Sequence, residues 1–304
     1  MGLLLKTGMS GLTVSLLTIL VAACGQEKSP TPSPSPVPAT ASAPSEPVYP
    51  SGTPSQKDVD RAADAADWPG RMVVSYEDAT NPDTQAGRDL MEQSQFLEGL
   101  ADSINQSMKL PNDIALKGAE CGEENAFWSS ADQSITMCYE YADWALKTFS
   151  KLGDPDPAAS ARGLLMATFY HETGHMASSI YDLPTTGREE DVADQAAAFI
   201  LLQPGDDGRL DQDALDAIMN YARGFQQDSE DRGPDVPEWL LADPHTLDKA
   251  RMYNFECWVY GADPIGNAGI VGDGMLPQDR ADGCEDEFAK LTHAWGTLLD
   301  PYLR

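Results

Sequence analysis

The first 57 residues of this chain cannot join a packed core, so a globular fold has to be built from residues 58–304. An uncharged apolar run over residues 12–23 is too short to span a membrane comfortably and ends in small residues. Residues 25–57 then hold nine prolines interleaved with Ser, Thr and Ala, a composition that favours extended polyproline-like conformations. We therefore expect a signal peptide over residues 1–24, a disordered tether and one folded domain.

The end of the apolar run, Val21-Ala22-Ala23-Cys24, resembles a bacterial lipobox, in which a lipidated Cys becomes the first residue of the mature protein. The alternative is an ordinary signal peptide, or an anchor helix with an incidental Cys. The tether that follows Cys24 favours the lipoprotein. We expect an exported bacterial lipoprotein of the cell envelope or cell surface, which contacts the membrane through its N-terminal lipid only.

Acidic side chains outnumber basic ones by 49 to 20, which gives a formal net charge of −29. The tether contains two Glu and two Lys and is neutral, so the folded region carries 47 acidic and 17 basic residues, a net charge of −30. A phosphate backbone requires a basic footprint, and anionic lipid headgroups require a polybasic face. We therefore expect no nucleic-acid partner and no electrostatic docking onto a membrane.

Four cysteines remain in the folded region once Cys24 is assigned to the lipid, an even number that is typical of disulfides in an exported protein. Three pairings are possible. Local spacing favours Cys121 with Cys138 and Cys257 with Cys284. Four free thiols are the alternative, and a Cys-rich metal site is a weaker one because no C-x-x-C spacing occurs.

Apolar periodicity predicts a mostly helical domain with one small sheet. The expected helices cover residues 84–109, 139–151, 158–180, 188–202, 211–226, 246–260 and 285–299. Short strands are expected at 114–116, 126–128 and 134–137, and a turn at 129–133 joins the last two into a hairpin. The fold class is therefore α+β, a single domain with a small antiparallel β-sheet.

His171-Glu172-Thr173-Gly174-His175 is an H-E-x-x-H pattern inside the predicted helix 158–180. Positions four apart lie on one face of a helix, about 40° apart around its axis, so both imidazoles can reach one zinc ion. Glu172 sits beside the first ligand, where it can take a proton from a metal-bound water. The alternative is a polar patch on a surface helix or a pair of hydrogen-bonded core histidines.

A catalytic zinc needs a third protein ligand, and the next acidic cluster begins the following predicted helix. Glu190 and Asp194 are four apart, which resembles the E-x-x-x-D signature of gluzincin metallopeptidases. The resemblance implies that Glu190 binds zinc and that Asp194 orients a ligating His. Asp191 is a possible ligand in place of Glu190. The alternative for the whole cluster is an acidic first turn that interacts favourably with the helix dipole and binds no metal. Glu189 has a competing role, because Thr186 and Glu189 match a capping box.

The resemblance extends beyond these motifs to nearly all of residues 68–304. It is carried, in order, by CGEENAFW (121–128), ITMCYE (135–140), HETGH (171–175), GREEDVADQAAA (187–198) and DPHTLDKARMYNFECWVYG (243–261). These segments are similar to a family of bacterial metallopeptidase-like proteins, DUF4344. The similarity implies a zincin-like fold and a metallopeptidase activity, and it supplies no substrate.

Zincins also imply roles for residues outside the motif. They commonly use a His, Tyr or Arg to stabilise the oxyanion of the tetrahedral intermediate, which implies His245 or Tyr253 in that role. A structural residue at a helix N-terminus is the alternative for His245. In many zincins an edge strand above the metal pairs with an extended substrate peptide, and the hairpin at Asn125 and Ala126 would be that strand.

Together these residues predict a membrane-tethered metallopeptidase that uses Zn²⁺ to hydrolyse a peptide or protein substrate. His171, His175 and Glu190 would hold the zinc, and Glu172 would be the general base. A catalytically inactive zincin-fold lipoprotein, acting as a metal-stabilised binding module, is the rival, and a structural zinc with a fourth protein ligand is a third. Glu172 favours the enzyme, because a binding module has no need for a carboxylate at that position.

Overall fold

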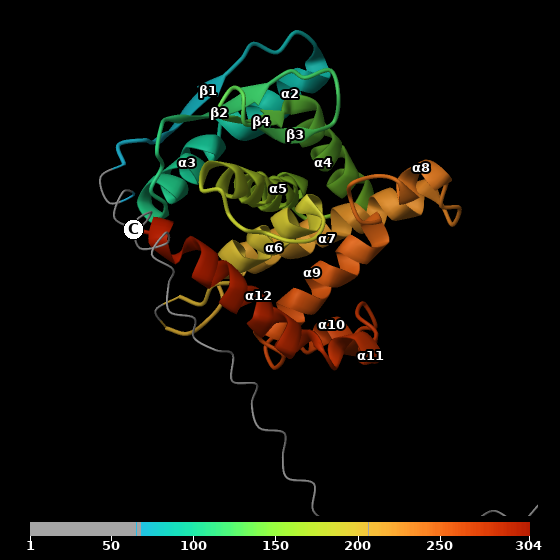
Figure 1. The fold of residues 1–304 in the computed structure, drawn as a ribbon. Helices are drawn as coiled ribbons and strands as arrows, with labels where there is room; N and C mark the ends of the chain where they lie inside the picture. The colour runs from blue at the N-terminus through green and yellow to red at the C-terminus, as the bar shows by residue number, and fades with distance from the viewer. Residues whose placement is uncertain (1–64, 66–67, 206) are drawn as a thin grey trace, which may run out of the picture. The chain divides into compact units, whose positions relative to one another are not determined.

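A four-stranded sheet lies on one side of a helical body in the computed structural model, which describes residues 65, 68–205 and 207–304 (Figure 1). These residues belong to one compact unit, Thr53–Arg304. The predicted signal peptide, the lipidation site at Cys24 and the tether lie outside the described residues. The predicted α+β class is confirmed.

The sheet is mixed, which corrects the antiparallel sheet expected from the sequence. Its order is β1-β2-β4-β3, with β1 parallel to β2, β2 parallel to β4, and β3 antiparallel to β4. The strands are β1 (Met72–Tyr76), β2 (Ile114–Ala119), β3 (Ala126–Ser129) and β4 (Ser134–Cys138). The hairpin β3–β4 was predicted, whereas β1 was not. Parallel pairs need long connections, so local sequence patterns do not reveal them.

Two helices connect β1 to β2, where the sequence predicts one helix over 84–109. They are α2 (Pro82–Glu92) and α3 (Phe96–Ser107). Between them Gln95 adopts a left-handed conformation, with φ of 51°, and this breaks the helix. The break lets α2 pack on α4 while α3 packs on β1, so each helix buries its own apolar face.

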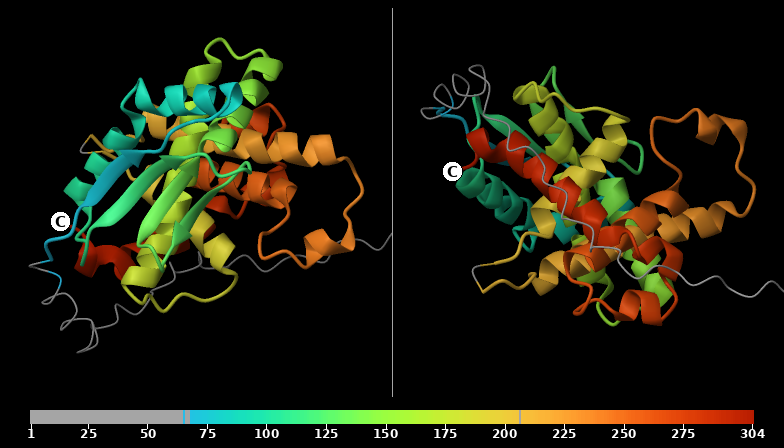
Figure 2. Two further views of the ribbon diagram at one scale, coloured as in Figure 1. Left: turned by 90° about the horizontal axis from the view of Figure 1, so that it is seen from above. Right: turned by 60° about the horizontal axis from the view of Figure 1, so that its bottom comes forward.

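The remaining helices form the body beneath the sheet (Figure 2). The long ones are α4 (Tyr139–Leu152), α5 (Pro157–Ile180), α6 (Glu189–Leu201), α7 (Gln212–Arg232), α9 (Asp248–Ala262) and α12 (Cys284–Leu299). The short ones are α8 (Glu238–Leu241), α10 (Gly269–Gly272), α11 (Gln278–Ala281) and the 3-10 turn Asp300–Tyr302. Helix α5 is central, because it packs on α4, α6, α7 and both strands of the hairpin.

Both predicted disulfides are confirmed. Cys121 and Cys138 link the segment after β2 to the end of β4, and Cys257 on α9 is bonded to Cys284 at the start of α12. The first bridge therefore fixes the end of β4, which packs on α5, and the second fixes the start of α12, which packs on α9.

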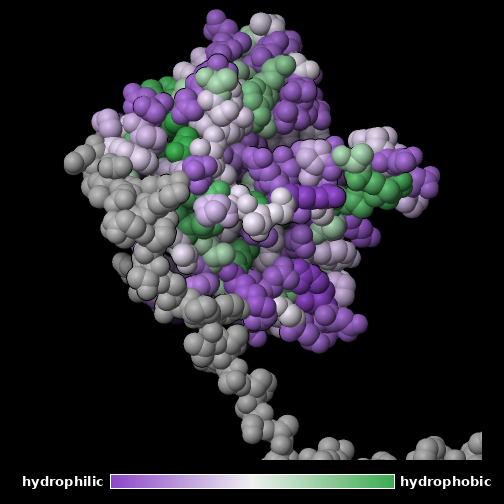
Figure 3. Space-filling view, viewed as in Figure 1, coloured by the Kyte–Doolittle hydropathy of each residue, from purple (hydrophilic) through white to green (hydrophobic). Residues whose placement is uncertain are grey.

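The visible surface is mostly hydrophilic, in line with the acidic composition, and one of its apolar areas lies at α8 (Figure 3). Val236, Trp239 and Leu241 are among the exposed large hydrophobic residues there. Among the described helices, none is long and apolar enough to cross a membrane.

Candidate metal centre

Helix α5 carries both histidines of the H-E-x-x-H pattern on one face. The helix starts at Pro157, and Asp156 is its N-cap. The Asp156 side chain accepts a hydrogen bond from Ala159 N–H. Its apolar residues are buried along most of its length, and His171 is buried with them. The Nε2 atoms of His171 and His175 lie 3.2 Å apart, as the four-residue spacing predicts.

Gly174, between the two histidines, lets α6 approach α5 closely. A Cβ at this position would lie 2.7 Å from Ala196 Cβ and 3.0 Å from Ala193 Cα. A side chain therefore cannot be added without moving the backbone of α6. The close approach brings the acidic first turns of α6 over the histidines of α5.

Glu190 on α6 is the carboxylate that reaches both histidines. Its Oε2 atom lies 3.2 Å from His171 Nε2 and 3.3 Å from His175 Nε2. These three side chains each offer a donor atom within 4.8 Å of the others, a group that can hold a metal ion. Asp191 is the next residue on α6, rotated by about 100°, and it belongs to no such group among the described residues.

Asp194 supports the far side of the His171 ring. Its Oδ1 lies 2.8 Å from His171 Nδ1, deep in the protein. Arg251 on α9 donates to the same carboxylate from Nε to Oδ2 at 2.8 Å and from Nη2 to Oδ1 at 2.7 Å. The guanidinium lies 4.0 Å from the centre of the Phe225 ring. Asp194 is thus paired on both sides while it is almost fully buried.

The other histidine has a similar but more exposed support. Glu189 Oε1 lies 3.1 Å from His175 Nδ1. The capping box expected at Thr186 and Glu189 is wrong, because α6 has Arg188 as its N-cap and no side-chain cap. The N-cap therefore lies two residues later than the capping box implies, and the Glu189 side chain lies on the face of α6 that contacts His175.

Glu172 lies beside the histidines with only 6% of its surface exposed. Its Oε1 atom is 4.0 Å from His171 Nε2, and its Oε2 atom accepts a hydrogen bond of 2.8 Å from the backbone N–H of Trp128 on β3. Burial raises the pKa of Glu172, although both histidines and the Trp128 N–H act in the opposite direction. A raised pKa suits a carboxyl group that has to accept and release a proton.

His245 reaches the same site from the segment before α9. Its Nε2 lies 3.0 Å from Glu190 Oε2, and its Nδ1 lies 2.8 Å from Asp243 Oδ1. Its side chain is 46% exposed, so it faces the open side of the cluster. The structure therefore brings together His171, Glu172, His175, Glu190, Asp194 and His245.

The family model of DUF4344, described as "Putative metallopeptidase", matches residues 76–299. The chain belongs to the DUF4344 family. The match runs from the last residue of β1 to the end of α12 and so includes every residue of the cluster. No curated protein and no solved structure matches the chain.

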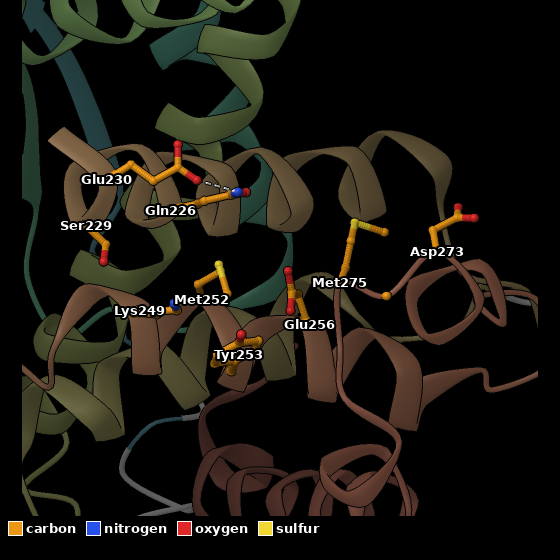
Figure 4. A pocket seen from close by; sticks show the side chains of 10 residues that line it. Gln226, Ser229, Glu230, Lys249, Met252, Tyr253, Glu256, Asp273 and Met275 are labelled. Carbon is orange, nitrogen blue, oxygen red and sulfur yellow. Dashed lines mark hydrogen bonds between the residues drawn. The ribbon is translucent and has the colours of Figure 1, made fainter. Parts of the chain in front are cut away.

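Tyr253 lies away from the cluster of this DUF4344 protein. It lines a pocket between α7 and α9 (Figure 4). Arg251 points from α9 toward Asp194, and a residue two positions later points about 200° around the helix axis from it. Tyr253 therefore faces the opposite side of α9, and His245 is the one of the two candidates that reaches the cluster.

Ala126 begins β3, the strand at the edge of the sheet, and Asn125 immediately precedes it. Cys138 N–H donates to Asn125 O, so the pair just beyond the ladder is hydrogen-bonded. Pairs alternate along antiparallel strands, which turns the backbone groups of Ala126 and Trp128 away from β4. The hydrogen bond from Trp128 N–H to Glu172 agrees with this orientation. This edge of the sheet therefore borders the cluster.

The acidic and basic groups of the cluster shift one another's pKa values in this DUF4344 chain. Burial alone would raise the pKa of Glu190, but hydrogen bonds from three histidines hold it far below its usual range. Burial alone would lower the pKa of His175, but Glu190 and Glu172 raise it to about 9. Burial opposes ionisation of Asp194 as well, and Arg251 and His171 lower its pKa to about 2. Both carboxylates are therefore ionised, which is the state in which a carboxylate can bind a metal ion.

Three contacts of this site were not predicted from the sequence. Arg251 had no predicted partner, the Trp128 N–H was not connected with Glu172, and Glu189 was assigned to a cap. A buried arginine needs a buried acidic partner, but the sequence of α9 has no single apolar stripe that would show Arg251 to be buried. Nothing in the local sequence identifies that partner.

Proposed function

We propose that this protein is a zinc-dependent metallopeptidase of zincin-like fold, with Glu172 as its general base. One observation supports it most directly: His171 Nε2, His175 Nε2 and Glu190 Oε2 lie close together beside the buried Glu172 carboxylate. Membership in a metallopeptidase family supports the same class of activity. The arrangement of two histidines on one helix and the carboxylate on the next supports a gluzincin-type site.

The donor atoms fit a zinc ion on chemical grounds. Asp194 and Glu189 lie at the Nδ1 atoms of His171 and His175, which favours the tautomer with the proton on Nδ1. In this neutral form, the one that binds a metal, both Nε2 atoms carry a lone pair, and they face one another and a carboxylate oxygen at 3.2–3.3 Å. Acceptors in mutual contact need a cation or protons between them. Two imidazoles and one carboxylate are an established catalytic zinc set.

Glu172 performs the proton transfers in the proposed mechanism. A zinc ion held by the three ligands would supply a Lewis acid, which lowers the pKa of water to about 7. Glu172 accepts the proton of the attacking water and passes it to the leaving amine. The Trp128 N–H holds the carboxylate in place through Oε2 and leaves Oε1 on the histidine side.

The free edge of β3 offers a place for the substrate backbone. An extended peptide that adds to a sheet edge uses main-chain hydrogen bonds, as β-augmentation does elsewhere. The Trp128 N–H is already bonded to Glu172, so we assign the pairing to Ala126. The side chain of Asn125 accepts from the Ala126 N–H and would have to move aside.

His245 decides between a catalytic and a structural zinc. As an oxyanion donor it would contact the substrate, and as a fourth ligand it would close the site. The 4.8 Å group of donor atoms contains His171, His175 and Glu190 but not His245, which supports the first role. Replacement by Ala separates the two: His245→Ala should keep zinc and lose kcat, whereas a structural site would lose zinc.

Metal analysis followed by a cleavage screen tests the proposed activity. The purified full chain should contain one zinc per chain and should cleave members of a diverse peptide library, and a chelator should abolish the cleavage. Zinc at one per chain without cleavage of any peptide would favour the inactive binding module. Absence of zinc after loading would contradict the metal site itself.

We also propose that the domain is exported and held at the membrane by a lipid on Cys24. Two disulfides in the folded region support an oxidising compartment. Labelling with a radioactive fatty acid, compared between the natural chain and Cys24→Ser, tests the anchor. Equal labelling of both would contradict it.

A further inference from the structure

The pocket that Tyr253 lines lies between α7, α9 and the segment after α10, with a volume of about 310 Å³ (Figure 4). It opens on a different side of α9 from the metal centre. Glu256 follows Arg251 by five residues, which is about 140° around the helix axis. The inference drawn from this pocket is therefore independent of the proposed peptidase activity.

Glu256 is a buried carboxylate without a partner at this pocket. Only 4% of its surface is exposed, and its Oε2 atom has no hydrogen-bond partner. No ion pair to Glu256 occurs among the described residues, although Lys249 lines the same pocket. Figure 4 places its carboxylate on the side of α9 that faces α7. A buried carboxylate that lacks a partner carries a large free-energy cost, which a bound cation would remove.

The rest of the lining suits a cation with an apolar stem. Glu230 and Asp273 add two carboxylates against the single ammonium of Lys249. Met252 and Met275 supply thioether walls, and the neighbouring Tyr253 adds an aromatic ring. Thioethers and alkyl chains pack well, and a tyrosine ring attracts an ammonium group.

A single metal ion does not fit this lining. Among the described residues, the carboxylates of the pocket do not form a group of three with donor atoms within 4.8 Å of one another. Their wider spacing matches a longer, organic cation. We propose that the pocket binds a primary alkylammonium ion, the chemistry shared by a lysine side chain and a small diamine, with Glu256 as its counter-ion.

Isothermal titration calorimetry on the full chain tests this site. The probes are 1,5-diaminopentane and Nα-acetyl-lysine amide, with 1,5-pentanediol as a neutral analogue of equal length. A chelator is present throughout, so that no amine binds through the metal centre. The variants are Glu256→Gln and the control Glu285→Gln, which removes the same charge from an exposed position on α12.

We expect at least one amine to bind the natural chain and Glu285→Gln equally, and the diol not to bind. Glu256→Gln should weaken the amine by about tenfold or more, because a charge-assisted hydrogen bond is lost. Tighter binding of the diamine would identify a free amine as the source, and tighter binding of the amide would identify a lysine side chain. Equal affinity in Glu256→Gln, or binding of neither amine to the natural chain, would overturn the proposal.

Discussion

Arg251 and Asp194 form a buried ion pair with two parallel hydrogen bonds, at 2.8 and 2.7 Å. The same carboxylate lies 2.8 Å from the Nδ1 atom of His171. The pair joins α9 to α6, and through His171 it joins both to α5. The guanidinium keeps Asp194 ionised, and an ionised carboxylate at this position favours the tautomer with the proton on Nδ1. The proposed metal site thus depends on a residue that contacts no ligand atom.

Loss of Arg251 should therefore destabilise the whole domain. Arg251→Met leaves Asp194 buried without its counter-charge, and we expect a loss of about 3–5 kcal/mol in the free energy of unfolding. Urea denaturation with a chelator present measures this without a contribution from metal. Arg251→Lys keeps the charge but not the bidentate geometry, so its free energy of unfolding should lie between those of the natural chain and Arg251→Met. Unchanged stability of Arg251→Met would show that the pair contributes nothing.

Gly174 should be required for the metal site through the spacing of two helices. Gly174→Ala puts a methyl group against Ala193 and Ala196, so α6 has to move away and carry Glu190 with it. We expect a zinc affinity lower by about tenfold or more, because a ligand is displaced. Gly99→Ala on α3, where a Cβ would meet nothing within 4 Å, is the matched control. Equal zinc affinity in both variants would refute this role.

Glu190 and Asp191 are adjacent acidic residues that should behave differently. Glu190→Gln should lose most of the bound zinc, because the Oε2 atom near both histidines loses its charge. Asp191→Asn should keep one zinc per chain. Dialysis followed by metal analysis compares the two. Zinc loss in Asp191→Asn alone would reverse the assignment.

Glu256 should make stability depend on pH near neutrality. Burial raises the pKa of Glu256 to about 7, whereas in an unfolded chain it is about 4.3. The folded protein binds this proton more tightly, so the contribution of Glu256 to stability falls as pH rises from about 4.3 to about 7 and is level above that.

Glu256→Gln removes this titration. The variant should gain on the order of 2 kcal/mol over the natural chain at about pH 8 and little at about pH 4.5. Urea denaturation at both pH values, with Glu285→Gln as the control, measures the difference. An equal gain in the free energy of unfolding at the two pH values would contradict the claim that Glu256 is a buried carboxylate without a partner.

Local sequence patterns predicted those parts of the fold that depend on local interactions. The helix that carries His171 and His175, the helix that follows it and the hairpin over residues 126–137 were all predicted, although the capping box at Thr186 placed the start of α6 two residues early. Strand β1 and the parallel pairs were not, because their partners are far apart in the chain. The break at Gln95 was missed because the apolar spacing continues across it.

The candidate site divides in the same way. The spacing of His171 and His175 indicated a shared centre, the resemblance to the E-x-x-x-D signature added Glu190, and the structure brings their donor atoms together. The side of α9 that faces this centre could not be predicted, because α9 is buried on several sides and has no single apolar stripe. Tyr253 was therefore chosen alongside His245, and only His245 reaches Glu190.

The most direct test compares the natural chain with Glu172→Gln in the same preparation, by zinc content and by the rate of peptide hydrolysis. We expect one zinc per chain in both proteins and a loss of about 100-fold or more in kcat for the variant, because Gln cannot accept a proton. His175→Ala should lose both zinc and activity. Full hydrolytic activity in zinc-loaded Glu172→Gln would contradict the assignment of Glu172 and the mechanism built on it.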